Sequence, residues 1–195
     1  MKVPIEVSAR HVHLTRGAFE TLFGEGIELT IRNELSQPGT FAAEETITLK
    51  TEKGQITNVR ILGPLRKYSQ VEISKTDARL LGLNPPIRDT HELELAGTPG
   101  ITLIGPKGSL KLGQGVIIAW RHIHMSPLEA VEAELKDGDL VKVDIDSDPR
   151  SVIFENVLVR LAPNFRLAMH IDTDEANAAG IEGGEIGKII VGFLE

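Results

Sequence analysis

The 195-residue sequence contains no cysteine, which excludes disulfides, thiolate metal ligands and any mechanism with a covalent cysteine intermediate. Aromatic residues make up only 4% of the chain, so aliphatic side chains must fill its cores. No apolar run approaches the roughly 20 residues that a membrane-spanning helix requires. A formal net charge of −7 argues against a reader of nucleic-acid phosphates, which needs a basic face. We therefore expect a soluble, cytoplasmic protein that binds neither nucleic acid nor membrane.

Short segments rich in β-branched residues account for much of the chain, and glycine, proline and aspartate separate them. Such segments predict a mainly β protein made of barrels or sandwiches rather than helical layers. The clearest are residues 45–49, 59–62, 101–104, 116–119 and 140–145. Short helices are predicted after residues that typically cap a helix N-terminus, namely Thr15, Ser74, Ser126 and Asp172. The segment 105–109 lacks the spacing of a phosphate-binding P-loop and predicts a hairpin turn.

Two pairs of segments match in the same order along the chain, which indicates an internal duplication. The matching pairs are residues 9–15 with 120–126 and residues 58–83 with 156–181. A duplication predicts two related small β-barrels with short capping helices, with the boundary in the glycine- and proline-rich stretch 99–115. The alternative is that both halves merely contain strand–turn–helix units common in β proteins.

Two His-x-His tripeptides, His11-Val12-His13 and His122-Ile123-His124, contain four of the six histidines. Side chains two residues apart on a strand point the same way, about 6.5 Å apart along the backbone, so each pair can reach one metal ion. The repeat places Glu72 opposite His170 and thereby supplies each pair with a third ligand. Three protein ligands leave a position open for substrate or water, which is typical of catalytic sites.

Other interpretations of these residues compete with metal binding. Glu72 could be an exposed strand carboxylate, and His170 could be a hydrogen-bonded core histidine. Cupins carry a glutamate shortly after the histidine pair, which residues 14–17 lack, and amidohydrolase barrels need about 250 residues. His91 lies outside both pairs, in a segment that predicts a solvated loop, and receives no role.

Arg66 is the candidate anion-binding residue near the first histidine pair. It precedes Glu72 by six residues and would share its face if one strand spanned both. A guanidinium donates two parallel hydrogen bonds and therefore suits a phosphate or a developing oxyanion. The alternative is a solvated cation at the end of a strand.

Seven segments together resemble the PduL-type phosphotransacylases, the phosphate propanoyltransferase family. They are VSARHVHL (7–14), LSQPG (35–39), FAAEE (41–45), LGP (62–64), QVEIS (70–74), RHIHM (121–125) and MHIDTDEAN (169–177). The likeness runs in order over nearly the whole chain. It implies two β-barrels with short helical caps, in which the N-terminal strand is exchanged. Residues 1–9 with 119–195 would form one domain, and residues 10–118 the other.

The resemblance also implies an activity, the interconversion of a short-chain acyl-CoA plus phosphate with acyl phosphate plus CoA. The acyl group would be acetyl or propanoyl, and phosphate would attack the thioester directly with the help of two zinc ions per chain. The family's zinc ligands correspond to His11, His13, Glu72, His122, His124 and His170. Its phosphate-binding arginine corresponds to Arg66. Its CoA contacts correspond to Ser8, Arg60, Leu62 and Asn177, and Arg160 is a further basic candidate.

Two other functions share the same ligands. A two-metal hydrolase would use zinc-bound water as its nucleophile, and a non-enzymatic barrel would bind a small ligand through the metal. Imidazole and carboxylate suit several metals, and only the resemblance favours zinc. Many relatives serve bacterial microcompartments through an N-terminal extension, which is not seen before residue 7. The expectation is a cytoplasmic enzyme outside such compartments, and a homodimer is compatible with it.

Overall fold

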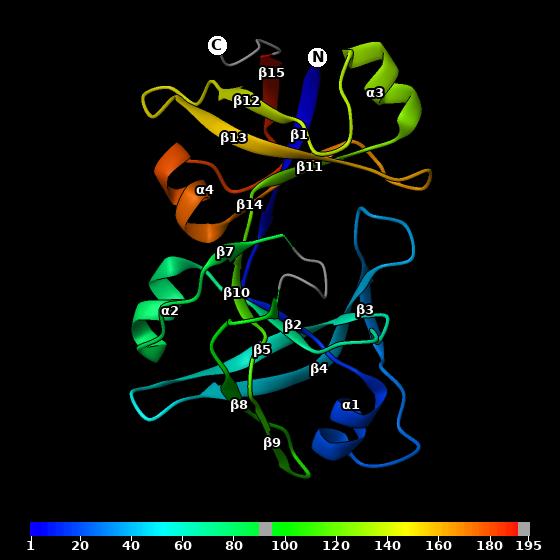
Figure 1. The fold of residues 1–195 in the computed structure, drawn as a ribbon, viewed down its shortest axis with the longest axis vertical. Coiled ribbons are helices and arrows are strands. Elements are labelled where there is room, and N and C mark those ends of the chain that lie inside the picture. Colours follow the sequence, from blue (N-terminus) through cyan, green and yellow to red (C-terminus); the bar gives the residue numbers. More distant parts are fainter. Residues whose placement is uncertain (90–94, 191–195) are drawn as a thin grey trace. The chain divides into compact units, whose positions relative to one another are not determined.

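The computed structural model describes residues 1–89 and 95–190, so the loop expected around His91 lies outside the described residues. The predicted mainly β architecture is confirmed (Figure 1). The chain divides into two compact units, which we call the barrel unit (residues 1–8 and 120–195) and the open-sheet unit (residues 9–119). The expected division into two domains, residues 1–9 with 119–195 and residues 10–118, stays a prediction. None of the described helices is long and apolar enough to cross a membrane.

Six strands of the barrel unit close into a barrel, in the order β1-β14-β11-β13-β12-β15. They are β1 (Lys2–Ser8), β11 (His122–Met125), β12 (Leu140–Ile145), β13 (Val152–Leu161), β14 (Ala168–Asp172) and β15 (Ile186–Ile190). Two short helices, α3 (Pro127–Ala133) and α4 (Thr173–Ala179), accompany it. The fully buried side chains are mainly aliphatic, as the shortage of aromatics requires, and include Ile5, Ile123, Met125 and Ile145.

The open-sheet unit contains a nine-stranded sheet, with the order β7-β10-β6-β2-β5-β4-β8-β9 and with β3 paired to β4. Its strands are β2 (His11–His13), β3 (Ile31–Glu34), β4 (Phe41–Lys50), β5 (Gln55–Gly63), β6 (Gln70–Glu72), β7 (Ile87–Arg88), β8 (Ile101–Ile104), β9 (Ser109–Leu112) and β10 (Val116–Ala119). The resemblance implies a second barrel, but over the described residues this sheet stays open. Closure needs end strands that pair along their length, and the end strand β7 has only two residues.

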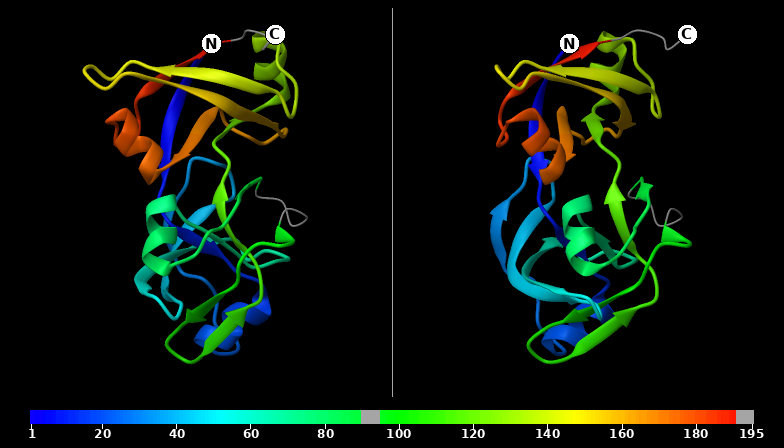
Figure 2. Two further views of the ribbon diagram at one scale, coloured as in Figure 1. Left: turned by 60° about the vertical axis from the view of Figure 1, so that its left-hand side comes forward. Right: turned by 90° about the vertical axis from the view of Figure 1, so that its left-hand side faces the viewer.

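The remaining helices, α1 (Arg16–Phe23) and α2 (Lys75–Leu81), belong to the open-sheet unit. The helix starts expected at Thr15, Ser74, Ser126 and Asp172 are confirmed as N-caps. The hairpin turn predicted at 105–109 joins β8 and β9, and the Gly105 amide donates to the Gly108 carbonyl at 2.9 Å. In both views of Figure 2, α1 lies beside this hairpin, where the Lys107 amide donates to the Leu22 carbonyl at 3.0 Å.

The capping box at the start of α3 provides a test of local stability. The Ser126 hydroxyl accepts from the Glu129 amide, and the Glu129 carboxylate accepts from the Ser126 amide at 2.8 Å. Ser126→Ala is expected to lower the free energy of unfolding of the barrel unit by about 1 kcal/mol. Urea titration followed by circular dichroism measures the effect. Ser109→Ala, at an exposed strand position, should change it little. Equal effects of the two substitutions would contradict a capping role.

The two units share a local arrangement around their histidine pairs. Strand β2 pairs in parallel with β5 and antiparallel with β6, and β11 pairs in the same way with β13 and β14. His11 lies opposite Glu72 in this register, and His122 lies opposite His170. Further equivalent positions have the same left-handed backbone, namely Asn58 (φ 57°) with Asn156 (φ 54°), and Gly82 (φ 62°) with Gly180 (φ 66°). These correspondences are consistent with the expected duplication.

The strand that precedes each histidine pair pairs within the opposite unit. Strand β1 precedes β2 in the chain but pairs with β14 and β15 of the barrel unit, as expected for an exchanged N-terminal strand. Strand β10 precedes β11 and pairs with β6 and β7 of the open-sheet unit. The exchange is therefore reciprocal. Glu6 on β1 lies opposite His170, and Ile117 on β10 lies opposite Glu72.

Candidate metal centres

The first candidate centre lies in the open-sheet unit, where β2 and β6 run side by side. The alternation of the strand puts His11 and His13 on one face, and their ring centroids are 5.0 Å apart. The antiparallel register brings the Glu72 carboxylate between them. Its Oε2 lies 3.4 Å from Nε2 of His11, and its Oε1 lies 3.6 Å from Nε2 of His13. All three residues are buried, and their donor atoms lie within 4.8 Å of one another.

The charges in this first centre are strongly coupled. Burial alone would raise the pKa of the Glu72 carboxyl, but the neighbouring His11 and His13 bring it well below its usual range. Burial lowers the pKa of His11, yet the Glu72 carboxylate outweighs burial and raises this pKa overall. Burial also lowers the pKa of His13, to about 4. Glu72 therefore favours the charged form of His11, whereas burial favours the neutral form of His13, which is the form that binds a metal.

Backbone carbonyls orient one histidine of each pair. Nδ1 of His11 lies 2.9 Å from the Ala9 carbonyl oxygen, and Nδ1 of His122 lies 2.7 Å from that of Trp120. Because a carbonyl oxygen only accepts, Nδ1 carries the proton in both rings. Nε2 is therefore left as the metal-binding atom, an arrangement common around metal-ligating histidines.

The second candidate centre lies in the barrel unit and consists of His122, His124 and His170. Ring centroids are 4.7 Å apart for His122 and His124, 5.2 Å for His122 and His170, and 4.7 Å for His124 and His170. Among the described residues, His11, His13 and Glu72 are the group whose donor atoms all lie within 4.8 Å of one another. The second set thus has its rings together but its donor atoms more widely spread.

The environment of the second centre favours the neutral form of the His122 imidazole, the form that binds metals. Burial, assisted by the positive charge of Arg160, brings the pKa of His122 well below its usual range. One neighbour that the sequence did not indicate is Glu6, whose Oε2 lies 3.7 Å from Nε2 of His170. The repeat gives no signal for this contact, because residues 5–8 and 116–119 share no identity.

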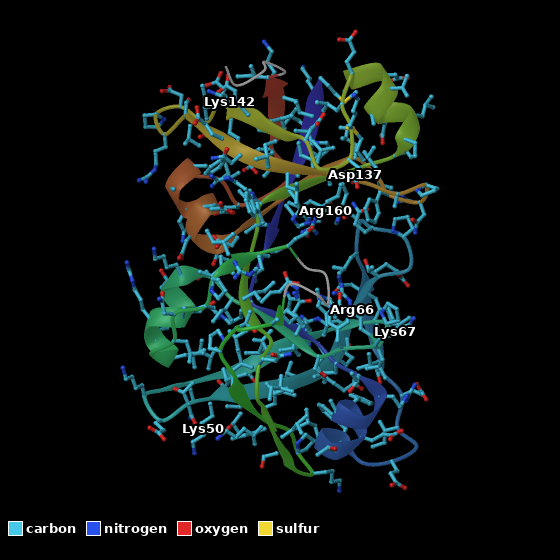
Figure 3. All side chains as sticks on the ribbon, viewed as in Figure 1. Lys50, Arg66, Lys67, Asp137, Lys142 and Arg160 are labelled. Carbon is cyan, nitrogen blue, oxygen red and sulfur yellow. The ribbon has the colours of Figure 1, made fainter. Side chains whose placement is uncertain are left out.

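Arg66 lies beside the first centre, but not on a strand. Strand β5 ends at Gly63 and β6 begins at Gln70, so Arg66 lies in the connection between them and does not share a strand with Glu72 (Figure 3). The Arg66 amide donates to the Leu14 carbonyl at 2.8 Å, which fixes the connection next to β2. Its guanidinium lies 3.5 Å from Oε1 of Gln70 and contributes to lowering the pKa of His13.

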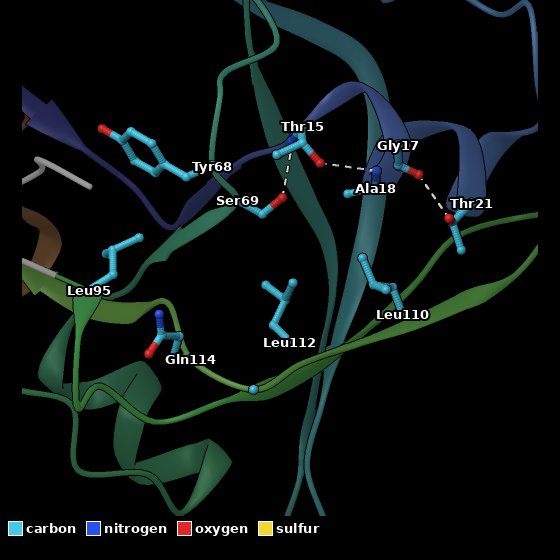
Figure 4. Close-up of a pocket in the computed structure, with 11 residues that line it drawn as sticks. Thr15, Gly17, Ala18, Thr21, Tyr68, Ser69, Leu95, Leu110, Leu112 and Gln114 are labelled. Atoms are coloured by element: carbon cyan, nitrogen blue, oxygen red, sulfur yellow. Dashed lines mark hydrogen bonds between the residues drawn. The ribbon is translucent and has the colours of Figure 1, made fainter. Parts of the chain in front are cut away.

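The predicted CoA contacts are distributed over both units. Ser8 ends β1, Arg160 is on β13 opposite His124, and Asn177 is on α4. Arg60 and Leu62 are on β5, where the Arg60 guanidinium donates to the carbonyls of Ala43 at 2.8 Å and Glu44 at 3.0 Å. These positions do not line the described pocket in the open-sheet unit, which has a volume of about 540 Å³ (Figure 4). That pocket is lined instead by α1, by β9 and by polar side chains that include Thr15, Ser69 and Gln114.

Comparisons with known proteins agree with the likeness seen in the motifs. A model of the phosphate propanoyltransferase family matches residues 4–182. The chain is 55% identical to a phosphate propanoyltransferase of Thermotoga maritima over 186 residues, which are 95% of this chain and 88% of that protein. It is 52% identical to the phosphate propanoyltransferase of Salmonella typhimurium over 190 residues, which are 97% of this chain and 89% of that protein. The chain therefore belongs to the phosphate propanoyltransferase family and is an acyltransferase.

Proposed function

We propose that this phosphate acyltransferase moves an acetyl or propanoyl group directly between the sulfur of CoA and an oxygen of inorganic phosphate, with two zinc ions per chain. The observation that carries the proposal is the buried group of His11, His13 and Glu72, whose donor atoms lie within 4.8 Å of one another. Towards acyl phosphate, a phosphate oxygen bonds to the thioester carbonyl carbon and the carbon–sulfur bond breaks. The proton lost by the phosphate balances the thiol of the CoA released.

The residues proposed to hold zinc are His11, His13 and Glu72 at the first centre and His122, His124 and His170 at the second. Imidazole nitrogen and carboxylate oxygen are ordinary zinc ligands, and the burial of the first set fits a bound dication better than an isolated cluster of polar groups. Zinc, when bound, supplies a Lewis acid that polarises oxygen and stabilises developing negative charge. The carbonyls of Ala9 and Trp120 keep Nε2 of His11 and His122 available as ligands.

Arg66 is proposed to bind the phosphate. Its positive charge acts on the first centre, where it contributes to lowering the pKa of His13 and opposes the raising of the pKa of His11 by Glu72. A planar guanidinium can donate two hydrogen bonds to one phosphate and fix the attacking oxygen in place. Orienting two bound reactants is itself a large source of rate acceleration.

CoA is proposed to bind through residues of both units, namely Ser8, Arg60, Leu62, Arg160 and Asn177. The carbonyls of Ala43 and Glu44 hold the Arg60 guanidinium on β5, where Arg60 lies opposite His11. The charge of Arg160 acts on His122. Either guanidinium could pair with a phosphate group of CoA. A cytoplasmic location outside bacterial microcompartments and a homodimeric assembly stay predictions.

The deciding experiment mixes the protein with acetyl-CoA or propanoyl-CoA, with and without phosphate, and follows free thiol. Thiol release that requires phosphate and yields acyl phosphate is the expected result. Release without phosphate would indicate a hydrolase, and binding without release would indicate a non-enzymatic metal-dependent barrel. Because the chain lacks cysteine, we expect a ternary complex, and isolation of a stable acylated enzyme would contradict direct transfer.

A further inference from the structure

Gln70 places a buried amide next to the first centre. It is the first residue of β6 and lies opposite His13 in the antiparallel register of β2 and β6. Side chains directly opposite one another in such a pair are close neighbours. The alternation of the strand puts Gln70 on the same face as Glu72, whose carboxylate lies between the two histidines. Gln70 is fully buried, so its amide belongs to the interior that surrounds the first centre.

Arg66 determines which way the Gln70 amide is turned. Nη1 of Arg66 lies 3.5 Å from Oε1 of Gln70. A guanidinium only donates hydrogen bonds, so the amide oxygen must face it and the NH2 group must point elsewhere. Among the described residues, Nε2 of Gln70 has no hydrogen-bond partner although it is buried. A buried donor without an acceptor is costly and rare in a native protein, which indicates that it serves a ligand.

The connection that carries Arg66 is fastened beside the histidine pair at two points. The Arg66 amide donates to the Leu14 carbonyl at 2.8 Å, and the Thr15 amide donates to the Ser69 hydroxyl at 3.1 Å (Figure 4). Both acceptor and donor on the histidine side belong to the residues that directly follow β2. Arg66 and Gln70 are therefore held in place before any ligand binds, which limits the entropy lost on binding.

We propose that Gln70 donates a hydrogen bond from Nε2 to the phosphate that Arg66 binds, an assignment that rests on the proposed phosphate site. The guanidinium and the amide NH2 then form one set of donors, joined through Oε1 of Gln70. Because the amide oxygen is already engaged, this set offers donors and no acceptor. It therefore selects a ligand rich in acceptor oxygens, which phosphate is. Hydrogen bonds to a charged ligand are the strong ones, and two directions of contact fix the attacking oxygen better than one.

The first test replaces Gln70 by methionine, which keeps the length of the side chain and removes its donor. Gln70→Met is expected to weaken phosphate binding, and to lower kcat/KM for phosphate, by about 10- to 100-fold, the usual cost of losing one hydrogen bond to a charged group. The KM for acetyl-CoA and the zinc content should not change. Calorimetry with inorganic phosphate and thiol release measure the two effects. Gln55→Met, at the exposed first position of β5, is the matched control and should alter neither.

A double-mutant cycle separates a direct contact from an effect through Arg66. If Gln70 merely held the guanidinium in place, Gln70→Met would have no further effect in a chain that already carries Arg66→Ala. We expect instead that it lowers kcat/KM for phosphate by about a further fivefold or more, because its own hydrogen bond is still lost. Equal values for Arg66→Ala and for the double variant would overturn the contact.

Gln70→Glu provides a second variant in case methionine disturbs the fold. It keeps the shape of the side chain and the oxygen that faces Arg66, but replaces the donor by a carboxylate oxygen. Its phosphate affinity should fall at least as far as that of Gln70→Met, and an unchanged affinity would overturn the assignment. Phosphate binding that depends on Gln70 in a protein without acyl transfer would support the contact and reject the proposed reaction. Normal transfer by the unmodified protein, with normal kcat/KM in Gln70→Met, would reject the contact alone.

Discussion

Replacing His11 and His13 together with alanine is expected to remove one zinc ion per chain and to lower phosphate-dependent acyl transfer by about 10³-fold or more. The reason is that a Lewis acid contributes several kcal/mol of charge stabilisation in the transition state, and each 1.36 kcal/mol corresponds to a factor of ten. Zinc content by elemental analysis and thiol release with acetyl-CoA measure the two effects. This change has the largest expected consequence, because the first centre lies beside Arg66 and has the most closely grouped donor atoms.

The same substitution leaves Glu72 buried without its histidine partners, so its effect on folding needs its own control. Retention of one zinc ion by the second centre, together with an unchanged circular dichroism spectrum, would show that the fold persists. His91→Ala removes the histidine outside both candidate centres and should keep both zinc ions and full activity. Full acyl transfer by the double variant, with one zinc ion lost, would eliminate the first centre from the reaction.

Arg66→Ala is expected to lower kcat/KM for phosphate by about 10²- to 10³-fold, the usual cost of removing one donor to a developing oxyanion. Zinc content should not change, because Arg66 is not among the proposed ligands. Arg66→Lys keeps the charge but loses the planar pair of donors, so it should recover only part of the lost activity. Initial rates at varied phosphate concentration, with phosphate binding measured by calorimetry, separate the loss of binding from the loss of turnover.

The neighbouring residue provides a matched control for Arg66. Lys67 is exposed on the same connection between β5 and β6 (Figure 3), so Lys67→Ala removes a positive charge without touching the proposed phosphate contact. Its kinetics should stay within about twofold of the unmodified protein, since exposed charges are largely screened by salt. Full activity and full phosphate affinity in Arg66→Ala would contradict the proposed role of Arg66 in phosphate binding.

The local features of the fold could be predicted well from the sequence. Helices α1, α2 and α4 begin after Thr15, Ser74 and Asp172 as expected, because capping depends on a side chain and amides only two or three residues ahead. The hairpin at residues 105–109 is equally local. The openness of the nine-stranded sheet was not predictable, since closure depends on the pairing of strands distant in the chain.

The candidate centres, like the fold, have features that could be predicted from the sequence and features that could not. The alternation of a strand puts the two histidines of each pair on one face, and this follows from the sequence. The third residues, Glu72 and His170, followed from the repeat, and the register of β6 and β14 places both as expected. Their role as ligands stays a prediction. The proximity of Glu6 to His170 could not be predicted from the sequence. It results from the parallel pairing of β1 with β14, which joins residues far apart in the chain.

The sequence by itself determined which donors are present, their pairing as His-x-His and the family to which they point, because these depend on residue type and short spacing. Only the tertiary structure decided how closely the carboxylates approach the histidines and which residues of the neighbouring parallel strands lie beside them. Cross-strand register and burial determine that Glu72 compensates charge at the first centre, where Ile117 is its apolar neighbour, and that Glu6 reaches His170 at the second. These contacts join residues far apart in the chain, and the free energy of burying charge makes each one matter.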